Sequence, residues 1–187
     1  MPEVHGFYDA GEKAYGSAIF LRWKLDDGSY TCVQLMVKAF VSLLKKKSIP
    51  RLELMGCLAL SRLYRTCREA LEFAEISSRK NVFWIDSQVV LSWLKTSRRR
   101  FRPFFSVQVA EIQETIDSQE LSYNTSEHNP ADASTKRILP EQLKKWSQGS
   151  RFLRKLQEEW PKIEENALKI NEELSAEMKP PTEARPT

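Results

Sequence analysis

Three strand-like runs joined by short breaks open the chain, and they restrict its fold more than any other feature. Residues alternate between two faces from Val4 to Asp9, and Ala10-Gly11 ends this first run. A second run covers residues 14–23, and the turn signal Asp26-Asp27-Gly28 joins it to a third at residues 30–37. Strands joined by such short loops pair as antiparallel neighbours. The sequence therefore predicts a three-stranded antiparallel meander.

Helices and one buried strand follow the meander. Pro50 begins a predicted helix that reaches about Leu71, because proline is accommodated where the backbone N–H needs no partner. The run from Val82 to Ile85 is apolar throughout, which predicts a central strand parallel to the first. The remaining predicted elements are helices at 87–95 and 103–115, a strand at 121–125, and a helix from Pro130 that continues after Pro140 toward Trp146. The order βββαβααβα predicts an α/β fold, a mixed five-stranded sheet flanked by helices.

Composition divides the chain into a domain and a tail. Hydrophobic residues make up 41% and charged residues 29%, which is typical of a globular protein. We expect one domain over residues 1–160 and a flexible, charged, proline-ending tail over 161–187. The net charge is +4, but the tail carries more acidic than basic residues. The domain is therefore the more basic part, which favours a polyanionic partner.

The cysteines and the apolar runs restrict the setting of the protein. Cys32, Cys57 and Cys67 are odd in number and lie inside apolar patterns. This predicts reduced core residues of an intracellular protein, cytoplasmic or nuclear, without a disulfide framework. No apolar run is long enough to predict a membrane-spanning helix, so no membrane partner is expected.

Two acidic residues end strands that the predicted topology makes neighbours. Asp9 ends the first strand and Asp86 follows the central one. The carboxyl ends of parallel neighbours meet at one edge of a sheet, where ligands collect. Alone, Asp9 has the ordinary alternative of a turn residue, and Asp86 that of a helix cap. Together they repel and raise at least one pKa unless a cation bridges them. Carboxylate ligands suit Mg²⁺ or Mn²⁺, and no Cys/His cluster predicts zinc.

Two further acidic residues belong to predicted helix starts. Glu53 lies in the first turn of its helix, and its neighbours at i+4 and i+7, Cys57 and Leu60, place it along an apolar stripe. A favourable interaction with the helix dipole is the ordinary alternative. Asp132 follows Asn129 and Pro130, which form a good helix start without any chemistry. Its occurrence with the three other acids is what favours a ligand role.

The segments that carry these acids resemble, in this order, the ribonuclease H domain of Bel/Pao-type LTR retrotransposon polyproteins. The matching stretches are VHGFYDAGEKAYGSAIFLR, KSIPRLEL, NVFWIDSQVVLSWLK, RPFFSVQVAEIQE and EHNPADASTK, followed by GSRFLRKLQEEWP. The resemblance implies the ribonuclease H fold and hydrolysis of the RNA strand of RNA–DNA hybrids. It carries over Asp9, Glu53, Asp86 and Asp132 as catalytic residues and as ligands of two Mg²⁺ ions, with Mn²⁺ as a substitute. The Glu comes second and on a helix, unlike the late Glu of integrases or the D-x-E strand of related exonucleases.

Some features depart from the resemblance or leave an alternative open. In cellular and retroviral ribonucleases H, a histidine with a role in product release lies in a loop well upstream of the last Asp. His128 lies only four residues before Asp132, so it is predicted to be a loop residue without that role. A reverse transcriptase or integrase region of a parent polyprotein is a further expected partner. The alternative function is a catalytically silent ribonuclease H-like domain that binds nucleic acid or a reverse transcriptase partner.

Basic segments supply candidate contacts to the hybrid. One runs from Trp93 through Arg98, Arg99, Arg100, Phe101 and Arg102, where aromatic residues interleave with charge; a second is Lys45, Lys46 and Lys47. Cationic groups along a backbone track bind the phosphates of a hybrid. Gln88, close after Asp86, is a candidate for reaching a sugar or base edge. Solvated loops are the ordinary alternative for both basic segments, and Trp84 and Trp146 are predicted to be core residues.

Overall fold

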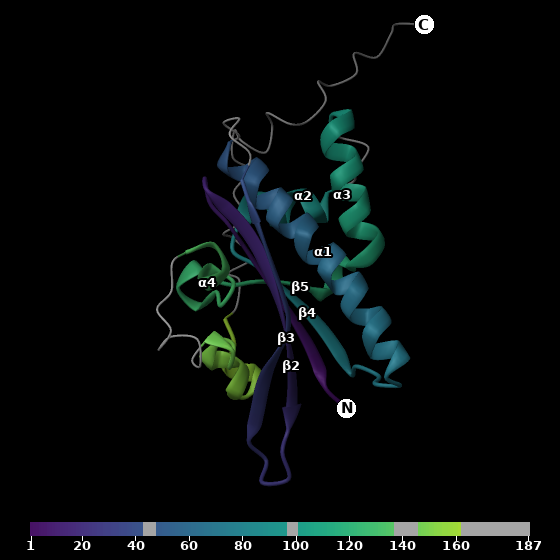
Figure 1. Cartoon of the computed structure of the whole chain (residues 1–187), viewed down its shortest axis with the longest axis vertical. Helices are drawn as coiled ribbons and strands as arrows, with labels where there is room; N and C mark the ends of the chain where they lie inside the picture. The colour runs from purple at the N-terminus through teal and green to yellow at the C-terminus, as the bar shows by residue number, and fades with distance from the viewer. Residues whose placement is uncertain (43–47, 97–100, 137–145, 162–187) are drawn as a thin grey trace, which may run out of the picture.

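The computed structural model describes residues 1–42, 48–96, 101–136 and 146–161. They form one sheet with helices packed against both faces (Figure 1). The principal elements are β1 (Glu3–Ala10), β2 (Ala14–Lys24), β3 (Tyr30–Val41), α1 (Ile49–Phe73), β4 (Lys80–Ile85), α2 (Gln88–Lys95), α3 (Pro103–Thr115), β5 (Leu121–Tyr123) and α4 (Asp132–Thr135). Short 3₁₀ turns lie at 118–120, 126–128, 151–154 and 157–159.

The sheet has the predicted mixed topology. Its strand order is β3-β2-β1-β4-β5, with β1 and β2 antiparallel, β2 and β3 antiparallel, and β4 parallel to both β1 and β5. The turn between β2 and β3 is closed at Gly28, whose positive φ of 84° suits glycine. The β1–β4 register pairs Phe7 with Trp84. Asp9 and Asp86 each lie two residues beyond this pair, so the same register brings them to one edge of the sheet.

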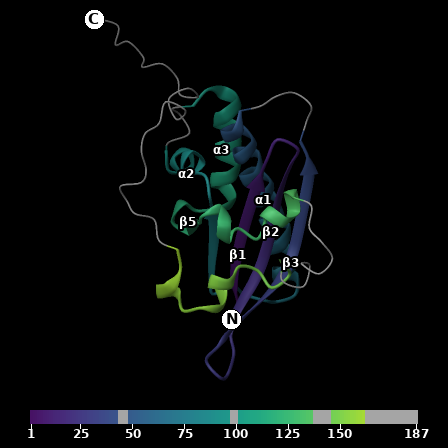
Figure 2. The same cartoon turned by 90° about the vertical axis from the view of Figure 1, so that its left-hand side faces the viewer.

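Two cores lie on opposite faces of the sheet, as the alternation along β1 predicts. Val4 and Tyr8 belong to the core under α1, α2 and α3, whereas Phe7 belongs to the core on the other face. Figure 2 shows that second face, where α4 and the C-terminal segment, residues 146–161, lie in front of the sheet. Phe152 and Trp160 of this segment complete the second core.

The three cysteines are free and buried, as predicted. Burial raises the pKa of Cys32 to about 12 and that of Cys67 to about 11. Such thiols stay protonated at neutral pH, so they serve as packing residues. None of the described helices is long and apolar enough to cross a membrane.

The predicted helix from Pro130 is wrong in its extent. Helix α4 begins at Asp132 and ends at Thr135, and Lys136 already has extended backbone angles. Side chains compete for the backbone here: the Ser134 hydroxyl donates to Ala131 O at 2.6 Å, and the Thr135 hydroxyl to Asp132 O at 3.1 Å. Such local bonds weaken helix propagation. The predicted continuation past Pro140 lies outside the described residues.

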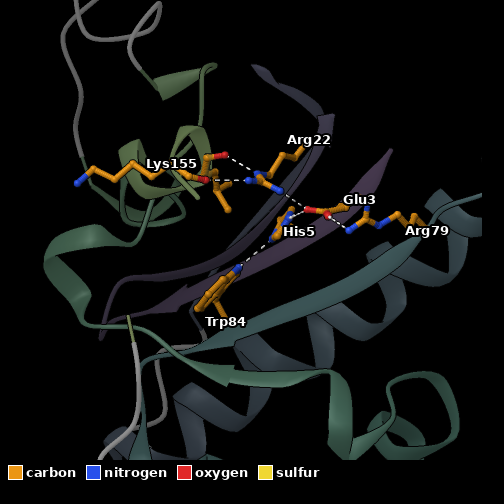
Figure 3. Close-up of polar contacts among 7 residues, drawn as sticks. Glu3, His5, Arg22, Arg79, Trp84 and Lys155 are labelled. Carbon is orange, nitrogen blue, oxygen red and sulfur yellow. Dashed lines mark hydrogen bonds and ion pairs between the residues drawn. The ribbon is translucent and has the colours of Figure 1, made fainter. Parts of the chain in front are cut away.

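A buried polar network anchors the C-terminal segment to the sheet (Figure 3). Arg22 of β2 is 2% exposed and pairs with Glu3, with Nη1 2.5 Å from Oε2. Its Nε donates to Leu153 O at 2.5 Å, and its Nη2 donates to Lys155 O at 2.8 Å. The Trp84 indole donates to His5 Nδ1 at 3.2 Å. Nδ1 is therefore the acceptor, and Nε2 carries the proton that faces Glu3.

Candidate active site

The carboxyl ends of β1 and β4 hold the first pair of candidate residues, Asp9 and Asp86, both half-buried. Burial raises the pKa of Asp86, and the nearby negative charge of Asp9 raises it further. Burial also raises the pKa of Asp9, with an added contribution from the charge of Asp132. Like charges in a partly dry setting disfavour ionisation. The raised pKa of Asp86 is in keeping with the predicted repulsion between the two strand-end carboxylates.

Both residues make contacts that their ordinary alternatives do not account for. Ser87, not Asp86, caps α2, because the Ser87 hydroxyl accepts a hydrogen bond from Val90 N at 3.3 Å. The turn after β1 is closed by the backbone, from Gly11 N to Ala14 O at 2.8 Å. The Asp9 carboxylate accepts a hydrogen bond from the Thr135 hydroxyl of α4 and one from the neighbouring backbone of Ala10. Both side chains are thus directed to the sheet edge and its loops.

Glu53 approaches the same edge from α1. The helix begins at Ile49, so Glu53 lies beyond its first turn, and the prediction of a first-turn position is wrong. One turn later, a Cβ on Gly56 would come within 2.7 Å of the Tyr8 ring, which shows how closely α1 packs on the end of β1. Glu53 is half-buried, as expected beside the fully buried Cys57 and Leu60.

The pKa of Tyr8 is affected by three of the four acidic residues. Burial raises its pKa well above the usual value, and the negative charges of Asp86, Glu53 and Asp9 contribute to the rise. The Tyr8 hydroxyl is buried and has no hydrogen-bond partner among the described residues. Carboxylates from β1, from α1 and from the residue after β4 therefore lie close enough to one phenol to affect its pKa.

Asp132 completes the set as the first residue of α4. It provides no cap hydrogen bond from its own side chain, since Ala131 occupies the capping position. Its carboxylate forms an ion pair with Lys136, which raises the pKa of the lysine. The charge of Asp132 still reaches Asp9, as the raised pKa of Asp9 shows. The structure thus places Asp132 at the same edge, with its carboxylate paired to a cation of the chain.

The donor chemistry of this edge suits a hard divalent cation, although the side chains are not gathered around one position. Carboxylate oxygens are preferred ligands of Mg²⁺, and the raised pKa values of Asp9 and Asp86 reflect repulsion that a cation would relieve. Within the described ranges, no group of three or more His, Cys, Asp or Glu side chains could hold a metal ion. Asp9 and Asp132 are turned toward Thr135 and Lys136 instead.

The predicted nucleic-acid contacts are only partly described. Gln88 is half-buried at the start of α2, and Arg102 is exposed immediately before α3. The predictions for Arg98, Arg99, Arg100, Lys45, Lys46 and Lys47 lie outside the described residues. Trp93 and Phe101 are 1% and 0% exposed. The interpretation of these aromatic residues as part of a contact surface is therefore wrong, because both are packed in the core.

Two tryptophans and His128 test smaller predictions. Trp84 is a core residue, as predicted. The prediction of Trp146 as a core residue is wrong: Trp146 is half-buried, belongs to neither core, and donates from its indole to Pro130 O at 2.8 Å. His128 is exposed in a 3₁₀ turn, with Nδ1 3.0 Å from the Thr125 hydroxyl, in keeping with its prediction as a loop residue.

Sequence reasoning missed the residues that hold the carboxylates. Asp86 Oδ2 accepts hydrogen bonds from Asn129 Nδ2 at 3.2 Å and from the Ser126 hydroxyl at 3.3 Å. Thr135 does the same for Asp9. All three lie in the segment around Asp132, whose density of Ser, Thr and Asn was the available signal. The sequence around Pro130 predicts Asn129 as a helix cap alone.

A comparison with protein families agrees with this geometry. Residues 1–87 match the family described as Pao retrotransposon-like RNaseH-like domain. The matched stretch contains Asp9, Glu53 and Asp86 and ends before Asn129 and Asp132. The mixed five-stranded sheet with flanking helices is the ribonuclease H-like fold. No curated protein matches the chain.

Proposed function

Because residues 1–87 match the family described as Pao retrotransposon-like RNaseH-like domain, we propose that this protein is a metal-dependent endonuclease that hydrolyses the RNA strand of RNA–DNA hybrids. The observation that carries the proposal is the placement of Asp9 and Asp86 at matching positions beyond the last β1–β4 pair. Burial and like charge raise the pKa of both. Such perturbed carboxylates are typical of functional sites.

Asp9, Glu53, Asp86 and Asp132 are the residues that would hold two Mg²⁺ ions, with Mn²⁺ as a substitute. When bound, such ions activate a water molecule for attack on a phosphodiester and stabilise the leaving oxygen. The chain supplies the orientation: Asn129 and Ser126 hold Asp86. To bind a metal ion, the Asp132 carboxylate would have to leave Lys136. It would then exchange its ion pair with the lysine for one with the metal, so its negative charge would stay paired.

The hybrid itself would be held mainly through its phosphates. Arg98, Arg99, Arg100 and Arg102 follow α2, whose first residue, Gln88, lies two positions after Asp86. Lys45, Lys46 and Lys47 precede α1, which carries Glu53. Both basic segments are therefore joined in sequence to helices that carry or adjoin the acids. A reverse transcriptase or integrase region of a parent polyprotein is a further proposed partner.

One observation favours the alternative function. The described side chains do not gather three ligands around a common point, and Asp132 is already paired with Lys136. A silent ribonuclease H-like domain would keep such an arrangement while binding nucleic acid or a reverse transcriptase partner. In that case the hybrid would bind and remain intact with either metal.

The experiment is cleavage of an end-labelled RNA–DNA hybrid with Mg²⁺, Mn²⁺ or EDTA, alongside RNA and DNA duplexes of the same sequence. Asp86→Asn is the test variant. Asp26→Asn is its matched control, because Asp26 is exposed in the β2–β3 turn, beyond the opposite edge of the sheet. We expect metal-dependent cleavage of the hybrid alone, lost in Asp86→Asn and kept in Asp26→Asn. Binding without cleavage in the parent protein would support the silent alternative.

A further inference from the structure

The side chain of Asn129 forms hydrogen bonds with one candidate ligand, Asp86, and with the residues that directly precede two others, Asp9 and Asp132. It is buried, with 6% exposure. Its Nδ2 donates to Tyr8 O at 2.6 Å and to Asp86 Oδ2 at 3.2 Å, and its Oδ1 accepts from Ala131 N at 3.0 Å. Tyr8 directly precedes Asp9, and Ala131 directly precedes Asp132. One amide group therefore joins the end of β1, the carboxylate after β4 and the start of α4.

This position requires an amide. The two Nδ2 hydrogens meet two acceptors and Oδ1 meets one donor, so both donors of the amide and one of its two acceptor sites are used. An aspartate would direct oxygen atoms at the Tyr8 carbonyl and the Asp86 carboxylate, and an aliphatic residue would leave buried polar groups without partners. A residue that served only as a loop cap would need the acceptor but neither of the donors.

The surrounding chain holds the amide in place. The backbone of Asn129 donates to Ser126 O at 3.1 Å. The next carbonyl, that of Pro130, accepts the Trp146 indole hydrogen bond at 2.8 Å. Ala131 is 0% exposed in the second core. The C-terminal segment thus supports the loop from one side while the sheet edge contacts it from the other.

We infer that Asn129 is a positioning residue that fixes the Asp86 carboxylate relative to Asp9 and Asp132. The inference rests on the proposed function for its role in the reaction, but not for the hydrogen bonds themselves. A group that orients a ligating carboxylate changes metal affinity and turnover, typically by 10- to 100-fold, without touching the substrate. Loss of the two donors should therefore weaken divalent-ion binding and lower kcat, with KM for the hybrid unchanged.

The test variant is Asn129→Ser, whose hydroxyl can still accept from Ala131 N but is too short to reach both Tyr8 O and Asp86. Its matched control is Asn81→Ser, because Asn81 lies at the other end of the same β4 strand and also donates to a carboxylate, Glu120, at 2.8 Å. Mn²⁺ binding is measured without substrate, by the loss of the free-ion electron paramagnetic resonance signal, and kcat and KM are measured on the hybrid. We expect at least a 10-fold rise in the Mn²⁺ Kd and an equal fall in kcat for Asn129→Ser, with Asn81→Ser within about 2-fold of the parent. Equal values for the two variants would overturn the inference.

A second measurement keeps the inference apart from the proposed function. Melting temperatures in EDTA are compared for Asn129→Ser, Asp86→Ala and the double variant. If Asn129 holds Asp86, the effects of the two substitutions on the melting temperature are coupled. The change in the double variant then differs from the sum of the changes in the two single variants. Coupled shifts in a protein without nuclease activity would support the positioning role and refute the function. Additive shifts would refute the positioning role whether or not the protein cleaves the hybrid.

Discussion

Replacement of Arg22 by Met should be among the most destabilising single changes in this protein. The guanidinium is almost completely buried between Glu3 and the carbonyls of Leu153 and Lys155. Met keeps much of the volume of the stem but leaves the buried charge of Glu3 without the guanidinium that pairs with it at 2.5 Å. Removing one member of a buried ion pair costs about 3–5 kcal/mol. In a domain of this size that corresponds to a fall in Tm of roughly 6–20 °C.

The pKa of Glu3 adds a pH signature to this loss. Contacts with His5 and Arg22 lower the pKa of Glu3 from 4.5 to about 2. The stabilisation by ionised Glu3 is therefore complete above pH 4.5 and is lost as the pH falls toward 2. In Arg22→Met the unpaired Glu3 protonates more readily, so the stability difference between variant and parent should shrink over this range.

Urea unfolding followed by far-UV circular dichroism, at several pH values, measures the difference. Arg62→Met is the matched control, because its pair with Glu111 is close, at 2.6 Å, but the Arg62 side chain is 56% exposed. Exposed pairs contribute about 0–1 kcal/mol. Glu3→Gln combined with Arg22→Met removes both charges and should restore part of the lost stability. A loss below about 1 kcal/mol in Arg22→Met, or no restoration in the double variant, would refute the reasoning.

The remaining predictions concern the acids and the basic segment. Asp9→Asn and Asp86→Asn should each raise Tm in EDTA at pH 7, because raised pKa values mean that ionisation costs stability above pH 3.8; a lower Tm in both would contradict this. Asp132→Asn should reduce the rate of Mg²⁺-supported cleavage in single-turnover assays by about 10-fold or more, which is about 1.4 kcal/mol in the activation barrier. The same rate as in the parent protein would show that Asp132 has a structural role only. The Arg98–Arg100 triple alanine variant should bind hybrids more weakly. In titrations at several salt concentrations, the slope of log binding constant against log salt concentration should be lower by about one unit per lost phosphate contact. An unchanged slope would mean that the phosphates are bound elsewhere on the protein.

The sequence predicted those parts of the site that depend on periodic pattern. The alternation along β1 assigns Tyr8 to one face and Phe7 to the other, and the apolar run of β4 marks a buried strand. Together they place Asp9 and Asp86 at one edge, because parallel neighbours end on the same side. The sequence pattern is informative here because a central strand is buried on both faces, which restricts its positions to apolar residues.

The contacts made across long separations could not be predicted in the same way. The Arg22 bond to Leu153 joins residues 131 positions apart, and nothing in the polar character of either segment indicates the other. Asn129 before Pro130 has the pattern of a helix start, which hides its donors to Tyr8 and Asp86. The early end of α4 likewise follows from hydroxyl bonds that propensity does not include.

The most direct test of the proposed nuclease is single-turnover cleavage of a labelled RNA–DNA hybrid by the parent protein and by Asp86→Asn in Mn²⁺. We predict that the parent cuts the RNA strand and leaves the DNA strand whole, that EDTA abolishes the reaction, and that Asp86→Asn loses it while remaining folded. Cleavage of equal rate in folded Asp86→Asn would contradict the assignment of the reaction to the edge between β1 and β4. No cleavage by the parent, with the hybrid bound, would contradict the nuclease proposal itself.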